Sequence, residues 1–231
     1  MNKKTLLVII PCILGLASCS ASSTSTSTST STEGSAATST EESTSLPEGS
    51  KEFIIEAEGS ESIEDLQGNG FSGTATGAEM ILRDTSGEYA ASDSLYVSYL
   101  YKNGLTLEYT FNSTVAISGA KLSWRISGEF YNMEFSCTDC MVTLNNNLIT
   151  YTTVTWNDIP TQLSGKKKAF SDYTLKTSCN IVEGENTLTY KVNNTRALGG
   201  TMAATSPMID CFKLTYVGDA EMSWDPTDYD R

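Results

Sequence analysis

The sequence predicts an all-β fold, an antiparallel β-sandwich, for residues 51–217. Three observations favour this class. Short segments with alternating apolar and polar residues recur through this part of the chain. Polar and glycine-containing turns separate these segments. No long segment shows the apolar period of a helix. Many short strands joined by polar turns are typical of a sandwich, and the region is long enough to bury a sizeable core.

Residues 1–18 predict a lipoprotein signal peptide. Lys3 and Lys4 precede an apolar run at residues 6–16, which is too short to span a bilayer and is typical of a signal-peptide core. The run ends in the letters LASC at residues 16–19, which resemble a bacterial lipobox. We therefore expect Cys19 to be lipidated and to anchor the chain on the extracellular face of a bacterial membrane. An ordinary secretory signal cut near the same place is the alternative.

Residues 19–50 follow as a tether in which serine and threonine predominate. Such a composition cannot bury a core, so we expect a disordered spacer. The chain carries a formal net charge of −13, and loss of Lys3 and Lys4 with the signal peptide would make it −15. An acidic chain is a poor partner for nucleic acid or for anionic lipid.

Histidine is absent from the sequence. Its absence excludes Ser-His-Asp and Cys-His nucleophile systems as well as zinc sites built on histidine. A catalytic pair of carboxylates remains compatible with the composition.

Residues 53–58 predict the first strand of the domain, because the segment is short, apolar and β-branched. Alternation places Phe53, Ile55 and Ala57 on the core face. Glu56 and Glu58 then share the other face, about 7 Å apart along the strand. This spacing lets both carboxylates reach one hard cation at the sheet edge, although two solvated glutamates would also fit the pattern.

Further strands are predicted in the middle of the domain. The expected strands, with the turns that border them, are 95–100, turn 102–104, 105–111, 121–126, 141–144, turn 145–147, 148–151, turn 183–186 and 187–192. In the segment 121–126, Leu122, Trp124 and Ile126 share one face. Residues 141–151 predict a hairpin.

Residues 208–216 predict the last strand, and alternation places Asp210 on its more apolar face, with Lys213 on the other. A lone buried carboxylate is costly unless it is paired or bound to metal. A cation shared by Glu56, Glu58 and Asp210 would satisfy it and would connect the first strand to the last. The acidic tail at 218–231 has Trp224 as its one large anchor, and either docks on the domain or extends freely.

Four segments together resemble carbohydrate-binding modules of families six and thirty-five, which are β-jelly-rolls of the galactose-binding-domain type. Residues 53–58 resemble the opening EAE strand, and residues 91–97 are similar to the SGG-Y-V segment. Residues 182–188 resemble L-x-x-G-x-N-T-I, and residues 209–212 resemble the closing I-D-x-I/L. The resemblance covers nearly all of residues 51–217. It implies a jelly roll with a structural calcium held by Glu56, Glu58 and Asp210.

The sequence also departs from the family pattern. The double glycine of the family is replaced by Asp93 and Ser94, and the asparagine that often precedes the closing Ile-Asp is replaced by Met208. The tryptophan expected upstream of the G-x-N turn is replaced by Phe170 or Tyr173.

Glycan sites use aromatic rings in loops, flanked by amide and charged groups. Trp156 is the best such ring, and Tyr131 is the next. Asn193 and Arg196 lie in the long loop before the last strand. We therefore expect Trp156, Tyr131, Asn193 and Arg196 to contact the ligand. The alternative is that they are ordinary loop residues, with Trp156 capping the core.

Four cysteines lie within the predicted domain: Cys137, Cys140, Cys179 and Cys211. Disulfides, free buried thiols and a zinc site that includes the C-x-x-C pair are all compatible with the sequence.

These features together predict a monomeric, lipid-anchored surface protein. Its jelly roll would bind a polysaccharide or surface glycan without catalysis. A structural or adhesive module that binds protein is one alternative, and a small hydrolase that uses acidic residues is another.

Overall fold

The computed structural model describes residues 46–67, 75–128, 133–159, 163, 168–195 and 206–229. Cys19, Tyr131 and Arg196 lie outside the described residues, as do the predicted signal peptide and most of the predicted tether. The described residues belong to one compact unit that extends from Ser45 to Arg231. Within the described part of the chain, no helix is long and apolar enough to cross a membrane.

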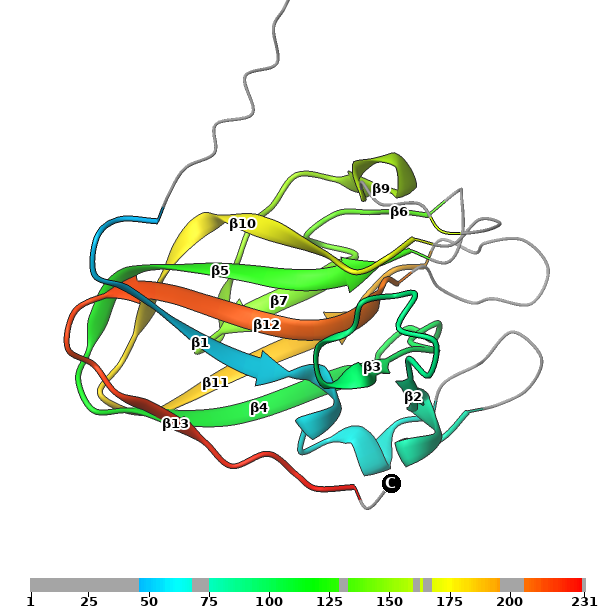
Figure 1. Cartoon of the computed structure of the whole chain (residues 1–231), viewed down its shortest axis with the longest axis horizontal. Coiled ribbons are helices and arrows are strands. Elements are labelled where there is room, and N and C mark those ends of the chain that lie inside the picture. Colours follow the sequence, from blue (N-terminus) through cyan, green and yellow to red (C-terminus); the bar gives the residue numbers. More distant parts are fainter. Residues whose placement is uncertain are drawn as a thin grey trace, which may run out of the picture. The chain divides into compact units, whose positions relative to one another are not determined.

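Two antiparallel sheets form the body of this unit (Figure 1). The first sheet has the order β10 (Ser171–Ile181), β5 (Ile117–Ser127), β12 (Met208–Val217), β3 (Leu95–Val97) and β2 (Ile81–Arg83), with β1 (Ser50–Glu56) also paired to β12. The second has the order β13 (Met222–Trp224), β4 (Thr106–Ser113), β11 (Gly184–Val192), β7 (Cys140–Leu144) and β8 (Asn147–Leu148). A short ribbon joins β6 (Glu134–Phe135) to β9 (Val154–Thr155). The all-β antiparallel sandwich is therefore confirmed.

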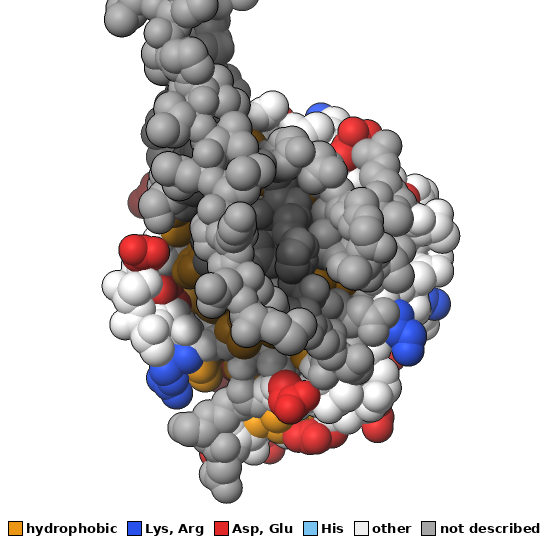
Figure 2. Space-filling view, turned by 90° about the vertical axis from the view of Figure 1, so that its right-hand side faces the viewer, with side chains coloured by type: hydrophobic (Ala, Val, Ile, Leu, Met, Phe, Trp, Pro, Cys, Tyr) orange, Lys and Arg blue, Asp and Glu red, His pale blue; other side chains and the backbone are white. Residues whose placement is uncertain are grey.

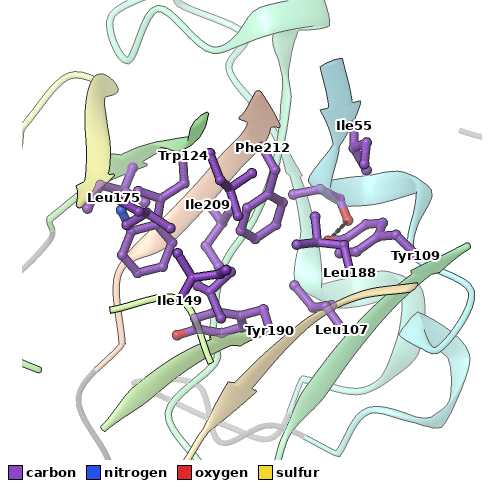
Figure 3. Packing of buried hydrophobic residues seen from close by; sticks show 14 of the residues in the cluster. Ile55, Leu107, Tyr109, Trp124, Ile149, Leu175, Leu188, Tyr190, Ile209 and Phe212 are labelled. Atoms are coloured by element: carbon purple, nitrogen blue, oxygen red, sulfur yellow. Dashed lines mark hydrogen bonds between the residues drawn. The ribbon is translucent and has the colours of Figure 1, made fainter. Parts of the chain in front are cut away.

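The core lies between the two sheets and is rich in aromatic rings (Figure 3). Trp124 of β5 stacks on Phe212 of β12, with ring centroids 6.4 Å apart, and lies 6.0 Å from Tyr190 of β11. All three side chains are fully buried. Alternate residues of β4 and β5 are buried, as their sequence patterns predict. Such aromatic pairs add to the stabilisation that burial alone provides.

The predicted hairpin at 141–151 is confirmed, although β8 ends at Leu148. Asn145 and Asn146 form its two-residue turn with φ angles of 51° and 62°. Asparagine tolerates this left-handed conformation, which suits the twist of a tight hairpin. The Asn145 side chain also donates to Asn186 Oδ1 at 2.8 Å and accepts from the backbone N–H of Thr187 at 2.9 Å.

Several predicted boundaries were wrong. Strand β1 ends at Glu56, so Glu58 lies in a 3-10 turn, η1 (Ala57–Gly59), instead of the same strand. Strand β3 ends at Val97, and β11 begins at Gly184 inside the predicted turn. The long strand β10 was missed, because its alternation is irregular where its pairing with β5 shifts register.

The predicted face of Asp210 was also wrong, because β12 contains a β-bulge at this residue. Ile209 pairs with Ile126 and Cys211 pairs with Arg125, so Asp210 is an extra residue in the ladder. A bulge changes which face the following side chains occupy. Asp210 therefore joins Arg125 on the outer face of the sheet, whereas Phe212 remains in the core.

The C-terminal tail docks on the domain. Its strand β13 pairs with β4 and extends the second sheet. The Trp224 ring lies so close to Gly59 that a Cβ atom added there would be 2.6 Å from Trp224 Cη2. Docking of the tail therefore requires glycine, or a displaced backbone, at position 59.

Candidate functional site

Ser92 brings two of the predicted carboxylates together. Its Oγ lies 2.8 Å from Glu56 Oε2 and 2.9 Å from Asp210 Oδ1, and its backbone N–H donates to the same Asp210 oxygen at 2.9 Å. A serine hydroxyl has one hydrogen and can donate to only one of these oxygens at a time. The other contact is favourable only if a carboxyl group is protonated or if a cation compensates its charge.

Asp210 is fully buried, and Arg125 is its cationic partner. Arg125 Nε lies 2.7 Å from Asp210 Oδ2, and Arg125 Nη2 donates to the carbonyl of Ala90 at 2.6 Å. Asp172 and Lys213 extend this row of charges, with Lys213 Nζ 3.0 Å from Asp172 Oδ1. The buried carboxylate is thus paired, which removes much of the cost of burying it.

Glu58 is less well satisfied. Its Oε2 atom is buried and has no hydrogen-bond partner among the described residues. Burial, followed by the charges of Glu56 and Asp210, raises the pKa of Glu58 from its ordinary value of 4.5 to about 7. Buried carboxylate oxygens are nearly always bonded, so this one is available to a proton, water molecule or cation.

The other two carboxyl groups are shifted in the same direction. Burial raises the pKa of Glu56 to about 6, against the hydrogen bond from Ser92. Burial also raises the pKa of Asp210 to about 6, although Ser92 and Arg125 favour its charged form. Keeping these three carboxyl groups ionised near neutral pH therefore costs free energy.

Carboxylate oxygens are the ligands that calcium prefers, and Glu58 Oε2, which has no hydrogen-bond partner among the described residues, is free to bind such an ion. Asp210 fits less well, because Arg125 and Ser92 engage its two oxygens. Within the described residues, no three acidic or cysteine side chains are grouped closely enough to hold a metal ion. Ligation of calcium by Glu56, Glu58 and Asp210 stays a prediction.

Trp156 begins a short 3-10 turn, η5 (Trp156–Asp158), which is capped at its start. Asp158 Oδ2 accepts from the backbone N–H of Thr155 at 2.6 Å and from its hydroxyl at 2.8 Å. The backbone N–H of Trp156 donates to Met133 at 3.0 Å. These bonds hold the ring at a defined place beside the β6–β9 ribbon.

The Trp156 side chain is half-buried and contacts the core. Lys168 lies beneath it, with Nζ 3.8 Å from the ring centroid, and donates to the carbonyl of Ile159 at 2.6 Å. Only 5% of Lys168 is exposed, so the exposed part of the ring lies away from the ammonium group. Trp156 therefore caps the core and also presents ring surface to solvent.

Asn193 is exposed, and its side-chain amide donates to the carbonyl of Thr138 at 3.0 Å. Thr138 follows the end of β6. Met133, whose carbonyl accepts the hydrogen bond from Trp156, lies just before the start of β6. The structure thus places Asn193 and Trp156 near opposite ends of this short strand. In the view turned toward the right-hand end of Figure 1, charged groups lie at the margin of the described surface, with hydrophobic side chains between them (Figure 2).

No disulfide joins any two of the four cysteines of the domain, and all but Cys137 are buried. Burial raises the pKa of Cys140 and of Cys211 to about 12 and that of Cys179 to about 11. A thiol with a raised pKa is a poor nucleophile and a poor metal ligand. Of the three alternatives, the structure agrees with free buried thiols.

Sequence reasoning missed Ser92, Arg125 and Lys168 as parts of these sites. Ser92 stands inside the segment that resembles the family, so its position could have drawn attention. Arg125 alternates with the buried Trp124, and the sequence pattern assigned it no role. No local pattern marks Lys168, whose role depends on the packing of Trp156 above it.

Comparisons with known proteins return structural matches only. No family model matches the chain, and no curated protein matches it. The chain is similar in fold to carbohydrate-binding modules of family thirty-five. A module from Clostridium thermocellum is 14% identical, with a TM-score of 0.44, over 73% of this chain and 99% of that one. A module from Paenibacillus barcinonensis is 14% identical, with a TM-score of 0.41, over 70% of this chain and 97% of that one.

The GH26-CBM35 β-(1,4)-mannanase of Podospora anserina is 16% identical, with a TM-score of 0.45, over 73% of this chain. This chain covers only 28% of the mannanase. At such identities the likeness concerns the fold, and the assignment of a β-sandwich rests on the strand order itself.

Proposed function

We propose that this chain is a surface-anchored lipoprotein whose jelly-roll domain binds a polysaccharide or surface glycan without catalysis. The observation that carries the glycan proposal is Trp156, a partly buried ring on the capped turn η5 that packs against the core and keeps some surface exposed. A sugar presents C–H groups to an aromatic face and hydroxyl groups to nearby polar side chains. Lys168 beneath the ring reduces its freedom to move, which lowers the cost of ordering it on binding.

The contacts proposed beside Trp156 are Asn193, Tyr131 and Arg196. Of these three, the structure describes only Asn193. Calcium bound to Glu56, Glu58 and Asp210 would stabilise the fold, and we expect the domain to act as a monomer.

A glycan array on the full chain tests binding, followed by calorimetry with the best ligand. Trp156→Ala should weaken binding at least about tenfold, as truncation of an aromatic anchor commonly does. Trp156→Phe keeps a ring on the same turn and should keep most of the affinity. Unfolding curves for both variants show whether a loss of binding reflects loss of the ring or loss of the core.

An array on which the wild type binds no glycan would favour the structural or adhesive alternative. Release of reducing ends from a bound polysaccharide would contradict binding without catalysis and would favour the hydrolase alternative. Such activity would implicate the carboxyl groups with raised pKa values, because an acid catalyst near neutral pH requires one.

Anchoring is tested separately with Cys19→Ser. The substitution removes the thiol that would be lipidated, so we expect an uncleaved precursor or a protein released from the membrane. Partition into detergent and the mass of the mature N-terminus measure the outcome. A fully processed variant that still partitions into detergent would contradict the lipid anchor.

A further inference from the structure

Lys168 is a buried lysine whose ammonium group has no acidic partner among the described residues. Only 5% of the residue is exposed, and the ion pairs between described residues do not include it. Its Nζ donates to the carbonyl of Ile159 at 2.6 Å. Asp158, the acidic residue of η5, bonds to Thr155 instead. Burying a charge without a counterion is costly, so the position of this ammonium group calls for an explanation.

The backbone of Lys168 is fixed beside the end of β5. Its N–H donates to the carbonyl of Gly128 at 3.2 Å, and its carbonyl accepts from the hydroxyl of Ser127. Its Nζ lies 3.8 Å from the centroid of the Trp156 ring, which is a cation–π distance. These contacts keep the ammonium group under the ring.

The ring itself is also fixed at one edge. A Cβ atom added at Gly128 would lie 3.2 Å from Trp156 Cδ1, so this edge packs close to the backbone of Gly128. Lys168 covers one face of the ring, and a ligand that stacks on Trp156 must therefore use the face turned away from the ammonium group. Lys168 then acts on the ligand by its charge, through the ring, and not by contact.

The charge beneath the ring changes what the open face attracts. An exposed indole ring attracts cations, and an acidic protein with a formal net charge of −13 draws cations to its surface. A cation stacked on the open face of Trp156 would lie no more than about 10 Å from Lys168 Nζ. This separation is within about one Debye length at 0.1 M salt, so the repulsion between the two cations is only partly screened.

We propose that Lys168 determines the specificity of the Trp156 site, because its charge makes the open face of the ring select neutral or anionic sugars over cationic ones. This inference rests on the proposed function, in which a glycan stacks on Trp156. The charge repels a sugar that carries a protonated amino group. A repulsive element against the wrong ligand is a general way to obtain specificity. Lys168 is thus a positioning residue that acts through Trp156.

Quenching of Trp156 fluorescence by iodide and by caesium tests the charge without any glycan. Both ions quench on encounter with an exposed ring, and constant ionic strength keeps their screening equal. The contribution of Trp156 is obtained by subtracting the signal of the matching protein that carries Trp156→Phe. The ratio of iodide to caesium quenching should fall at least about threefold in Lys168→Met, which removes the charge. Lys168→Arg keeps the charge and should keep the ratio.

Lys176→Met, the same change at an exposed position of β10, is the matched control and should leave the ratio unchanged. Urea unfolding shows whether Lys168→Met is folded. If it is not, Lys168→Gln takes its place, because its side-chain amide keeps a donor for the carbonyl of Ile159. An equal ratio in wild type and in the uncharged variant would overturn the proposal, and so would an equal fall in Lys168→Arg.

Calorimetry measures the specificity itself, with chitohexaose in its neutral N-acetylated form and in its deacetylated, protonated form at mildly acidic pH. The preference of wild type for the neutral form should be at least about threefold greater than that of Lys168→Met. Equal preferences would overturn the proposal. If the glycan array shows no binding at all, the proposed function is refuted, and the quenching ratio still decides whether the charge of Lys168 acts through the ring.

Discussion

Glu58 should make the stability of the domain depend on pH in a direction that can be worked out. Its pKa is raised from 4.5 to about 7 in the folded protein, so the folded state binds more protons than the unfolded state between these values. The free energy of unfolding must then fall as pH rises through this window and level off above it. The contribution is opposite in sign to that of a carboxylate stabilised by a salt bridge.

The size of the effect follows from the same values. A difference from 4.5 to about 7 corresponds to roughly 3 kcal/mol, since a tenfold change in proton affinity is about 1.4 kcal/mol. Partial exposure of Glu58 to solvent reduces this to about 1–2 kcal/mol. Glu58→Gln keeps the shape of a neutral glutamate and removes the charge. It should match wild type near pH 4.5 and be more stable by about 1–2 kcal/mol above pH 7.

Urea unfolding of chelator-treated protein across this pH range measures the difference between wild type and Glu58→Gln. For a domain of this size, about 1 kcal/mol also corresponds to a melting temperature shift of about 2–4 °C. Glu52→Gln, the same change at an exposed position of β1, is the matched control. A difference that stays constant from pH 4.5 to above 7, or equal behaviour of the two variants, would refute the reasoning.

Two further predictions concern the same end of the sheet. Gly59→Ala would place a Cβ atom 2.6 Å from Trp224 and 2.8 Å from Pro226 Cβ, so overpacking should cost about 1–3 kcal/mol and expose the C-terminal segment to protease. The cost should shrink in a Trp224→Ala background, and an equal cost in both backgrounds would show that the tail does not dock there. Asp210→Ala removes the nearer of the two carboxylates that face Arg125 and should lower stability by about 3–5 kcal/mol, measured by urea unfolding. If calcium also binds Asp210, chelator should lower the melting temperature of wild type but hardly affect Asp210→Ala; equal sensitivity would exclude that ligand.

The local pattern of the chain was enough to predict the fold class. Side-chain alternation is a property of each strand, so the buried faces of β4 and β5 could be assigned without knowing their neighbours. The turn at Asn145 could be predicted because asparagine tolerates the backbone angles of a tight hairpin. The proximity of Glu56 and Asp210 was also predicted, and Ser92 now accounts for it.

Only the tertiary structure decided which hydrogen-bond and ion-pair partners the buried carboxylates of Glu58 and Asp210 have. The bulge that turns Asp210 toward Arg125 depends on the register between β12 and β5, which no segment specifies alone. Docking of the C-terminal tail depends on contact between Trp224 and Gly59, which are far apart in the sequence. Alternation and turn chemistry act between neighbouring residues and can be inferred from the sequence. Register, bulges and the burial of single charges result from packing between distant strands, and they determine where this domain holds an unsatisfied carboxylate.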